Sequence, residues 1–191
     1  MPPSVAGQLS RRKPGHAIHT IGHSTHSLEQ FLALLGRHEI EAVADVRRYP
    51  SSRRFPHFNA GSLAESLPAA GIEYVQLGDA LGGRRTPRPD TPNGGWRVAG
   101  FRGYADHMPS EEFRAALAQL ERLGRERRTA FMCAEGPWWR CHRQLIADAL
   151  VARGWEVAHV MPDGHIEEHR LTPFATVEGE QITYPGQGSL V

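Results

Sequence analysis

The chain has 191 residues, of which 40% are hydrophobic and 23% are charged, and its formal net charge is +1. This length suits one domain with a substantial core and is too short for two ordinary domains joined by a linker. The small net charge excludes a strong overall field toward nucleic acid or a membrane, so local clusters of charge matter more. No apolar run approaches the roughly 18 residues of a membrane span, so we expect no membrane partner.

The N-terminal segment and the cysteines indicate a cytoplasmic protein. Residues 1–15 are rich in Pro, Ser and Arg and lack the apolar region of a signal peptide, so we interpret them as a flexible basic tail. Two cysteines, Cys133 and Cys141, cannot supply a disulfide framework, and reduced thiols are expected. Lys13 is the only lysine, so we expect arginine, which grips carboxylate or phosphate bidentately, to be the functional cation.

Short alternating or continuous apolar runs, bounded by glycines and charges, predict five strands. In chain order these strands cover 17–21, 42–46, 73–77, 129–133 and 156–160. Apolar residues at helical spacing predict helices between them, with capping residues and glycines at the ends. The expected helices run from a capping box of Ser27 and Gln30 to Gly36, from a second box of Ser62 and Glu65 to Gly71, from Ser110 to Gly124, and over 145–150 to Gly154.

Strands that alternate with helices predict an α/β fold. We expect a single domain at 16–173 with a mostly parallel, Rossmann-like (doubly wound) sheet of about five strands flanked by helices. A turn and an edge strand are expected at 163–169, and residues 174–191 are expected to form an irregular C-terminal tail. Residues 78–103 are dense in Arg, Gly and Pro without periodicity, which predicts a long loop of the kind that commonly forms a functional lid.

Polar residues gather where the predicted strands end, which is where open parallel sheets bind ligands. The segments concerned are Gly22-His23-Ser24, Asp45-Val46-Arg47-Arg48, Cys133-Ala134-Glu135 and, at the start of the last helix, Cys141-His142-Arg143. Arg143 is the best single candidate for an anion site, because the first turn of a helix adds free N–H groups and a positive dipole end. The alternative is that Arg143 pairs with Glu135 or Asp45 to satisfy buried charge.

These segments suggest an anionic, phosphate-bearing ligand such as a nucleotide or a nucleic-acid end, with hydrolase or transferase activity as an open question. In the enzymatic hypothesis, Asp45 or Glu135 transfers protons, and His23 orients a reacting group or shuttles a proton. Cys133 is then an optional nucleophile with a lowered pKa. Six residues separate Cys133 from Arg140, one more than in the anion loops of cysteine phosphatases, so a plain buried cysteine is the competing interpretation. The expected ligand-binding residues are Ser24, Arg47, Tyr104, Cys141, His142 and Arg143.

Two other functions remain open. A metal-binding protein would use His23, His26, Cys133, Cys141 and His142 for zinc or iron, but the spacing matches no recognised ligand pattern and we predict no cofactor. A non-catalytic nucleic-acid-binding module would use the arginines and aromatic residues of 50–58 and 84–102. A solvated loop is the alternative for both of those segments.

Several motifs occur in order and together closely resemble the domain of unknown function 488 family. They are Thr20-Ile-Gly-His-Ser24, Asp45-Val-Arg47 with Pro50 and Ser52, Phe55 to Asn59, Leu81-Gly-Gly83, Phe101-Arg-Gly-Tyr104, and Cys133-Ala-Glu135 followed by Cys141-His-Arg143. The likeness runs from about Ala17 to about Thr172. The resemblance implies a Rossmann-like domain of bacteria and archaea, sometimes discussed in connection with DNA repair, and no settled activity.

Overall fold

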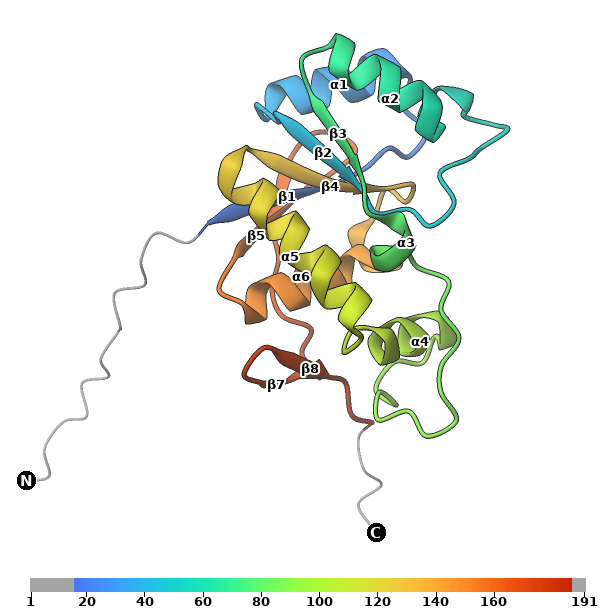
Figure 1. Cartoon of the computed structure of the whole chain (residues 1–191), viewed down its shortest axis with the longest axis vertical. Coiled ribbons are helices and arrows are strands. Elements are labelled where there is room, and N and C mark those ends of the chain that lie inside the picture. Colours follow the sequence, from blue (N-terminus) through green and yellow to red (C-terminus); the bar gives the residue numbers. More distant parts are fainter. Residues whose placement is uncertain (1–15, 187–191) are drawn as a thin grey trace, which may run out of the picture.

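Six strands form one sheet in the order β3-β2-β4-β1-β5-β6 in the computed structural model, which describes residues 16–186 (Figure 1). The strands β1 to β5 are parallel and β6 pairs with β5 in the antiparallel sense. Their bounds are β1 Ala17–Gly22, β2 Ala42–Asp45, β3 Glu73–Gln76, β4 Thr129–Cys133, β5 Glu156–Val160 and β6 Ile166–Glu168. The predicted parallel α/β sheet and its edge strand are confirmed, while the expected tail over 1–15 lies outside the described residues.

Helices cover both faces of the sheet, as a doubly wound fold requires (Figure 1). The helices are α1 Leu28–Arg37, α2 Ala60–Ala69, α3 Gly78–Leu81, α4 Ala99–His107, α5 Glu111–Glu126 and α6 Arg143–Ala152, with short 3-10 turns η1 Pro56–Phe58 and η2 Trp138–Arg140. The apolar side chains of α1 and α2 pack in one core cluster, and those of α4, α5 and α6 in another on the opposite face. The strand β2 is buried along its whole length because both faces are covered.

The helix starts follow the sequence signals only in part. Ser27 caps α1 and forms the expected capping box with Gln30. The second box is wrong, because α2 begins at Ala60 and the Ser62 hydroxyl instead donates to the carbonyl oxygen of Pro56. Ser110 caps α5 as expected, but Gly124 lies inside that helix, where a glycine is tolerated at a cost of about 1 kcal/mol.

Two segments that lacked periodicity are more ordered than expected. Within 78–103 the structure contains α3 and the first turns of α4, so the long loop is confined to the stretch between them. Of the expected irregular tail at 174–191, the described part contains a hairpin, β7 Thr176–Glu178 with β8 Gln181–Thr183, while residues 187–191 lie outside the described residues. The hairpin is stabilised because Ile182 and Tyr184 are buried in the core beside α6. Strands of three residues are too short to show a hydrophobic pattern in the sequence, so the hairpin was not predicted.

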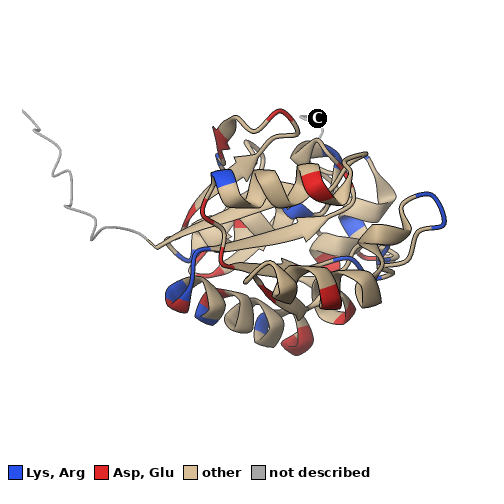
Figure 2. Ribbon diagram, turned by 90° about the horizontal axis from the view of Figure 1, so that it is seen from above, with Lys and Arg blue, Asp and Glu red and all other residues tan. Residues whose placement is uncertain are grey.

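Charge and hydropathy on the folded chain match the composition. Figure 2 shows acidic and basic positions both spread over the helices and loops, so neither sign dominates the ribbon. Within 16–186 no helix combines the length and apolar character that a membrane crossing demands. Function therefore has to be sought in local clusters at the sheet ends.

Candidate functional site

A pocket of about 320 Å³ opens at the carboxyl ends of β2 and β4. The chain leaving β2 continues to α2 on one face of the sheet, whereas the chain leaving β4 continues to α6 on the other. Neighbouring parallel strands whose connections leave to opposite faces create the crevice in which such sheets bind ligands. The residues that line the pocket come from the segments 47–49, 83–84, 98–101, 133–135 and 140–142.

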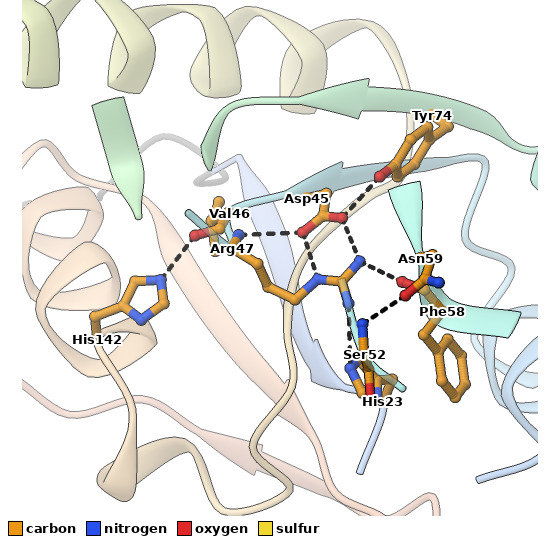
Figure 3. A network of polar contacts seen from close by, with 9 residues as sticks. All are labelled: His23, Asp45, Val46, Arg47, Ser52, Phe58, Asn59, Tyr74 and His142. Carbon is orange, nitrogen blue, oxygen red and sulfur yellow. Dashed lines mark hydrogen bonds and ion pairs between the residues drawn. The ribbon is translucent and has the colours of Figure 1, made fainter. Parts of the chain in front are cut away.

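Arg47 is fixed by the carboxylate that ends β2 (Figure 3). The Asp45 carboxylate accepts hydrogen bonds from the Arg47 backbone N–H at 3.1 Å, from Nε at 2.9 Å and from Nη2 at 2.6 Å. Tyr74 donates to the same carboxylate at 2.7 Å, and Arg47 Nη2 also donates to the carbonyl oxygen of Phe58 at 2.7 Å. Asp45 is 1% exposed, so its lone pairs serve to position Arg47, and it does not face the pocket as a free proton-transfer group.

His23 lies behind Arg47 and outside the pocket lining. Its ring stacks on Phe58 with centroids 4.2 Å apart, and Nε2 lies 3.3 Å from Arg47 Nη1 (Figure 3). Burial and the neighbouring Arg47 charge lower the pKa of His23 to about 4. The imidazole is therefore neutral at neutral pH and packs as part of the wall that holds Arg47.

Three other arginines surround the pocket without a carboxylate partner among the described residues. Arg48 and Arg84 both lie over the exposed Tyr49 ring, with guanidinium carbons 5.6 and 5.8 Å from its centroid. Arg48 Nη1 also donates to the carbonyl oxygen of Arg84 at 3.1 Å. Arg140, on η2, is exposed and contributes the third cation.

The conformation of Arg84 supports a role in the pocket. Its φ is 61°, in the left-handed region where a residue other than glycine costs about 1 to 2 kcal/mol. Strain of this kind persists only where the surrounding structure enforces it, and it concentrates at functional sites. Among the described lining residues, Glu135 is the one that carries a carboxylate, and it forms no ion pair with these arginines.

Both cysteines lie at the buried end of the pocket, with their sulfur atoms 2.7 Å apart. Burial and the hydrogen bond to Cys141 raise the pKa of Cys133 well above its usual value. For Cys141, burial disfavours the thiolate, but hydrogen bonds from Cys133 and Arg143 and the Arg143 charge outweigh burial and lower its pKa to about 7. Cys141 is thus a better candidate for an activated thiol than Cys133, the nucleophile expected from the sequence.

His142 and Tyr104 form the wall beside the cysteines. His142 Nε2 lies 2.9 Å from the carbonyl oxygen of Val46, which makes Nε2 the protonated nitrogen of the neutral ring (Figure 3). Its other nitrogen, Nδ1, is then an acceptor 3.6 Å from the Cys141 sulfur. Tyr104 is fully buried and donates to the carbonyl oxygen of Leu81, so it supports the ring of His142 and does not contact the pocket.

Arg143 does not reach the pocket, contrary to the expectation that it forms the anion site. It is 0% exposed, and Nη2 donates to the carbonyl oxygens of Glu135 at 2.5 Å and Gly136 at 3.0 Å. The side chain turns inward because these carbonyls, at the turn after β4, are buried and need donors. The competing expectation of an ion pair with Glu135 or Asp45 is also wrong, since Arg143 contacts the backbone of Glu135 and not its carboxylate.

A chain of buried polar groups holds Arg143 from behind. Thr20 Oγ1 accepts from Arg143 Nη1 at 3.2 Å and lies 2.8 Å from His159 Nδ1. His159 Nε2 lies 2.9 Å from His169 Nδ1, and His169 Nε2 lies 2.9 Å from the Asp148 carboxylate. With both imidazoles neutral, every link has one donor and one acceptor, and the chain runs in one direction from guanidinium to carboxylate.

The sequence-predicted site residues divide into two groups. Arg47, Cys133, Glu135, Cys141 and His142 line the pocket. The others lie outside its lining and support the residues that form it: His23, Ser24, Asp45, Tyr104 and Arg143. Ser24 contributes through its backbone, whose N–H donates to the carbonyl oxygen of Ala134 at 2.9 Å.

The rim arginines were the residues missing from the predicted site. Arg48 stood in a strand-end segment, Arg84 in an arginine-rich stretch that a solvated loop explains equally well, and Arg140 only in the spacing from Cys133. Their signal was the scarcity of acidic residues beside them in 46–54, 81–88 and 137–144. The side chains named for the alternative metal-binding function do not form a site. Within 16–186, no three His, Cys, Asp or Glu side chains come close enough to hold an ion.

Comparison with known proteins returns one family. The model of the family described as Domain of unknown function DUF488 matches residues 27–150. The match covers more than half of the chain and contains the strand ends from β2 to β4 and most of α6. Neither the curated proteins nor the solved structures contain a significant match.

Proposed function

The chain belongs to the DUF488 family, whose description carries no activity, and we propose that its arginine pocket binds a small phosphate-bearing anion. The observation that carries the proposal is the set of three arginines, Arg48, Arg84 and Arg140, around one cavity without a carboxylate partner among the described residues. Guanidinium groups that are not neutralised within the fold favour an anionic ligand, and their planar fork matches phosphate oxygens.

The size and the rim of the pocket favour a mononucleotide or the terminal phosphate of a nucleic acid. A volume of about 320 Å³ is at the lower end of small-molecule sites, which span roughly 300–1,000 Å³. Tyr49 is 61% exposed and Phe101 lines the same pocket, so an aromatic base has rings to stack on. An extended nucleic-acid backbone would need a basic face, whereas Figure 2 shows both signs of charge interspersed.

Two groups in the pocket are available for chemistry on such a ligand. The Cys141 sulfur is the candidate nucleophile, because hydrogen bonds from Cys133 and Arg143 and the Arg143 charge lower its pKa in spite of burial. The Glu135 carboxylate is exposed in the same pocket and can transfer protons. A hydrolase or transferase activity would act through these two residues, with Arg47 holding the pocket wall.

Calorimetric titration tests the proposal with inorganic phosphate, a nucleoside monophosphate and the matching nucleoside. The wild-type chain should bind the phosphate compounds and bind the nucleoside far more weakly. Replacing Arg84 or Arg140 by Gln should weaken binding by about 10-fold or more, because a charge-assisted hydrogen bond contributes about 1.5–3 kcal/mol.

A matched control is Arg122→Gln, since Arg122 is an exposed arginine on α5 that lies outside this pocket. It should leave the affinity unchanged. Equal binding of the nucleoside and its monophosphate, or unchanged affinity in both pocket variants, would show that the site does not recognise phosphate.

A further inference from the structure

Cys133 and Cys141 lie close together, although Cys133 ends β4 and Cys141 is the residue before the N-cap of α6. Seven residues separate the two cysteines in the chain, and η2 folds that segment back so that the sulfurs lie 2.7 Å apart. A disulfide needs sulfurs about 2.05 Å apart, and the two sulfurs already lie near that separation. The chain contains two cysteines in all, so each is the other's only intramolecular partner.

The surroundings of the pair favour a thiolate on Cys141. The buried guanidinium of Arg143 has no carboxylate partner within the described part of the chain, and its Nε has no hydrogen-bond acceptor there. Its backbone N–H donates to the Cys141 sulfur at 3.4 Å, at the start of α6 where free N–H groups favour negative charge. His142 Nδ1, an acceptor 3.6 Å from the same sulfur, does not stabilise the thiolate itself but can accept the thiol proton as the thiolate forms. The two cysteines are thus differentiated, with Cys141 as the anion and Cys133 as the hydrogen-bond donor.

The burial of the two sulfur atoms limits the size of the oxidant that can reach them. Cys133 and Cys141 are 2% and 4% exposed, and both contribute to the floor of the arginine pocket. A bulky disulfide would have to bring its sulfur atoms to this floor past the rim, whereas a peroxide has two oxygen atoms and needs little room. The geometry therefore favours a small hydroperoxide.

We propose that Cys133 and Cys141 form a redox couple that a small hydroperoxide closes into an intramolecular disulfide. The Cys141 thiolate attacks one peroxide oxygen, an S–O bond forms as the O–O bond breaks, and the hydroxide that leaves becomes water by taking a proton from solvent. The Cys133 sulfur then attacks the Cys141 sulfur, the S–O bond breaks, and the departing hydroxide takes the Cys133 proton. In total the two thiols lose two electrons, and hydrogen peroxide is reduced to two water molecules.

This activity does not depend on the phosphate site and has its own test. The reduced wild-type chain is treated with hydrogen peroxide at neutral pH and followed by intact mass and by peptide mapping without reductant. We expect a loss of two hydrogens, a linked peptide pair containing Cys133 and Cys141, a monomeric chain, and recovery of the starting mass with dithiothreitol. The reaction should be about 10-fold faster than for the same chain unfolded in guanidinium, where neither thiol is activated.

Single variants separate the two roles. Cys133→Ser should stop at the sulfenic acid of Cys141, which dimedone traps as a stable adduct. Cys141→Ser should leave Cys133 unmodified over the same time, because the pKa of the Cys133 thiol is raised by burial. Circular dichroism checks that each variant is folded, and the wild-type measurement stands even if one variant is not.

Several results would overturn the couple. An unmodified wild-type chain, a disulfide between two chains, or equal rates for the folded and unfolded chain would each exclude it. Equal trapping of Cys133 and Cys141 in the two variants would refute the assigned order of attack. The two proposals can fail separately. A chain that forms the disulfide but binds no phosphate would refute only the phosphate site, and a chain that binds phosphate but forms no disulfide would refute only the redox couple.

Discussion

The guanidinium of Arg143 donates from Nη2 to the carbonyl oxygen of Gly136 at 3.0 Å, which ties the start of α6 to the turn after β4. The same atom binds the Glu135 carbonyl oxygen, so the turn that carries one wall of the pocket is held by one buried side chain. A buried cation that donates to backbone carbonyls and to the Thr20 hydroxyl organises the pocket wall from outside the pocket lining.

Replacing Arg143 by Lys should destabilise the protein, because an ammonium group cannot reproduce the planar fork that reaches both carbonyls and Thr20. We expect the free energy of unfolding in urea to fall by about 3 kcal/mol. The pKa of Cys141 should rise as well, since Arg143 contributes to lowering it. Arg140→Lys, an exposed change on the same turn, is the control and should alter stability by less than about 0.5 kcal/mol. Equal losses in the two variants would mean that Arg143 does not hold the turn.

Replacing Gly22 or Gly36 by alanine should change the free energy of unfolding in opposite directions. A β-carbon on Gly22 would collide with the backbone carbonyl of Glu135, so Gly22→Ala should displace the turn and cost about 1–3 kcal/mol. A β-carbon on Gly36 meets nothing within 4 Å and lies in α1, so Gly36→Ala should stabilise by about 1 kcal/mol. Denaturant unfolding of the two variants measures both values, and a neutral Gly22→Ala would show that the strand end and the turn are not in contact.

Acid should destabilise the protein partly through His23. Burial and the Arg47 charge lower the pKa of His23 from 6.5 to about 4, so between these values the unfolded chain binds a proton that the folded chain does not. Stability therefore falls as the pH drops from about 6.5 to about 4, and it gains nothing further from this group above about 6.5. The shift corresponds to at most about 3 kcal/mol at the acid end.

The measurement is the free energy of unfolding across this pH range for the wild type and for His23→Gln. The variant should show a shallower dependence on pH, because Gln does not titrate. His159, whose pKa is lowered to about 2 mainly by burial and also by the Arg143 charge, adds a similar dependence to both proteins. Parallel curves for the two proteins would assign the acid sensitivity to groups other than His23.

Local sequence signals were sufficient for the sheet and for the position of the pocket. The apolar runs of β2 and β4 and the capping box of Ser27 with Gln30 each depend on residues within a few positions of one another. Alternating strands and helices then require a parallel sheet, and a parallel sheet collects its carboxyl ends at one edge. The segments from Asp45 to Arg48 and from Cys133 to Arg143 were expected at this edge for that reason.

Periodicity and spacing by themselves determined the α/β class, the strands and the edge of the sheet at which the chemistry gathers. Only the tertiary structure decided that Arg143 turns inward, that the sulfurs of Cys133 and Cys141 meet, and that Arg84 and Arg140 line one cavity. The physical reason is that the direction of a side chain and the pKa of a buried group depend on neighbours distant in sequence. Thr20 and Gly136, which fix Arg143, come from separate parts of the chain that meet only when β1 pairs with β4.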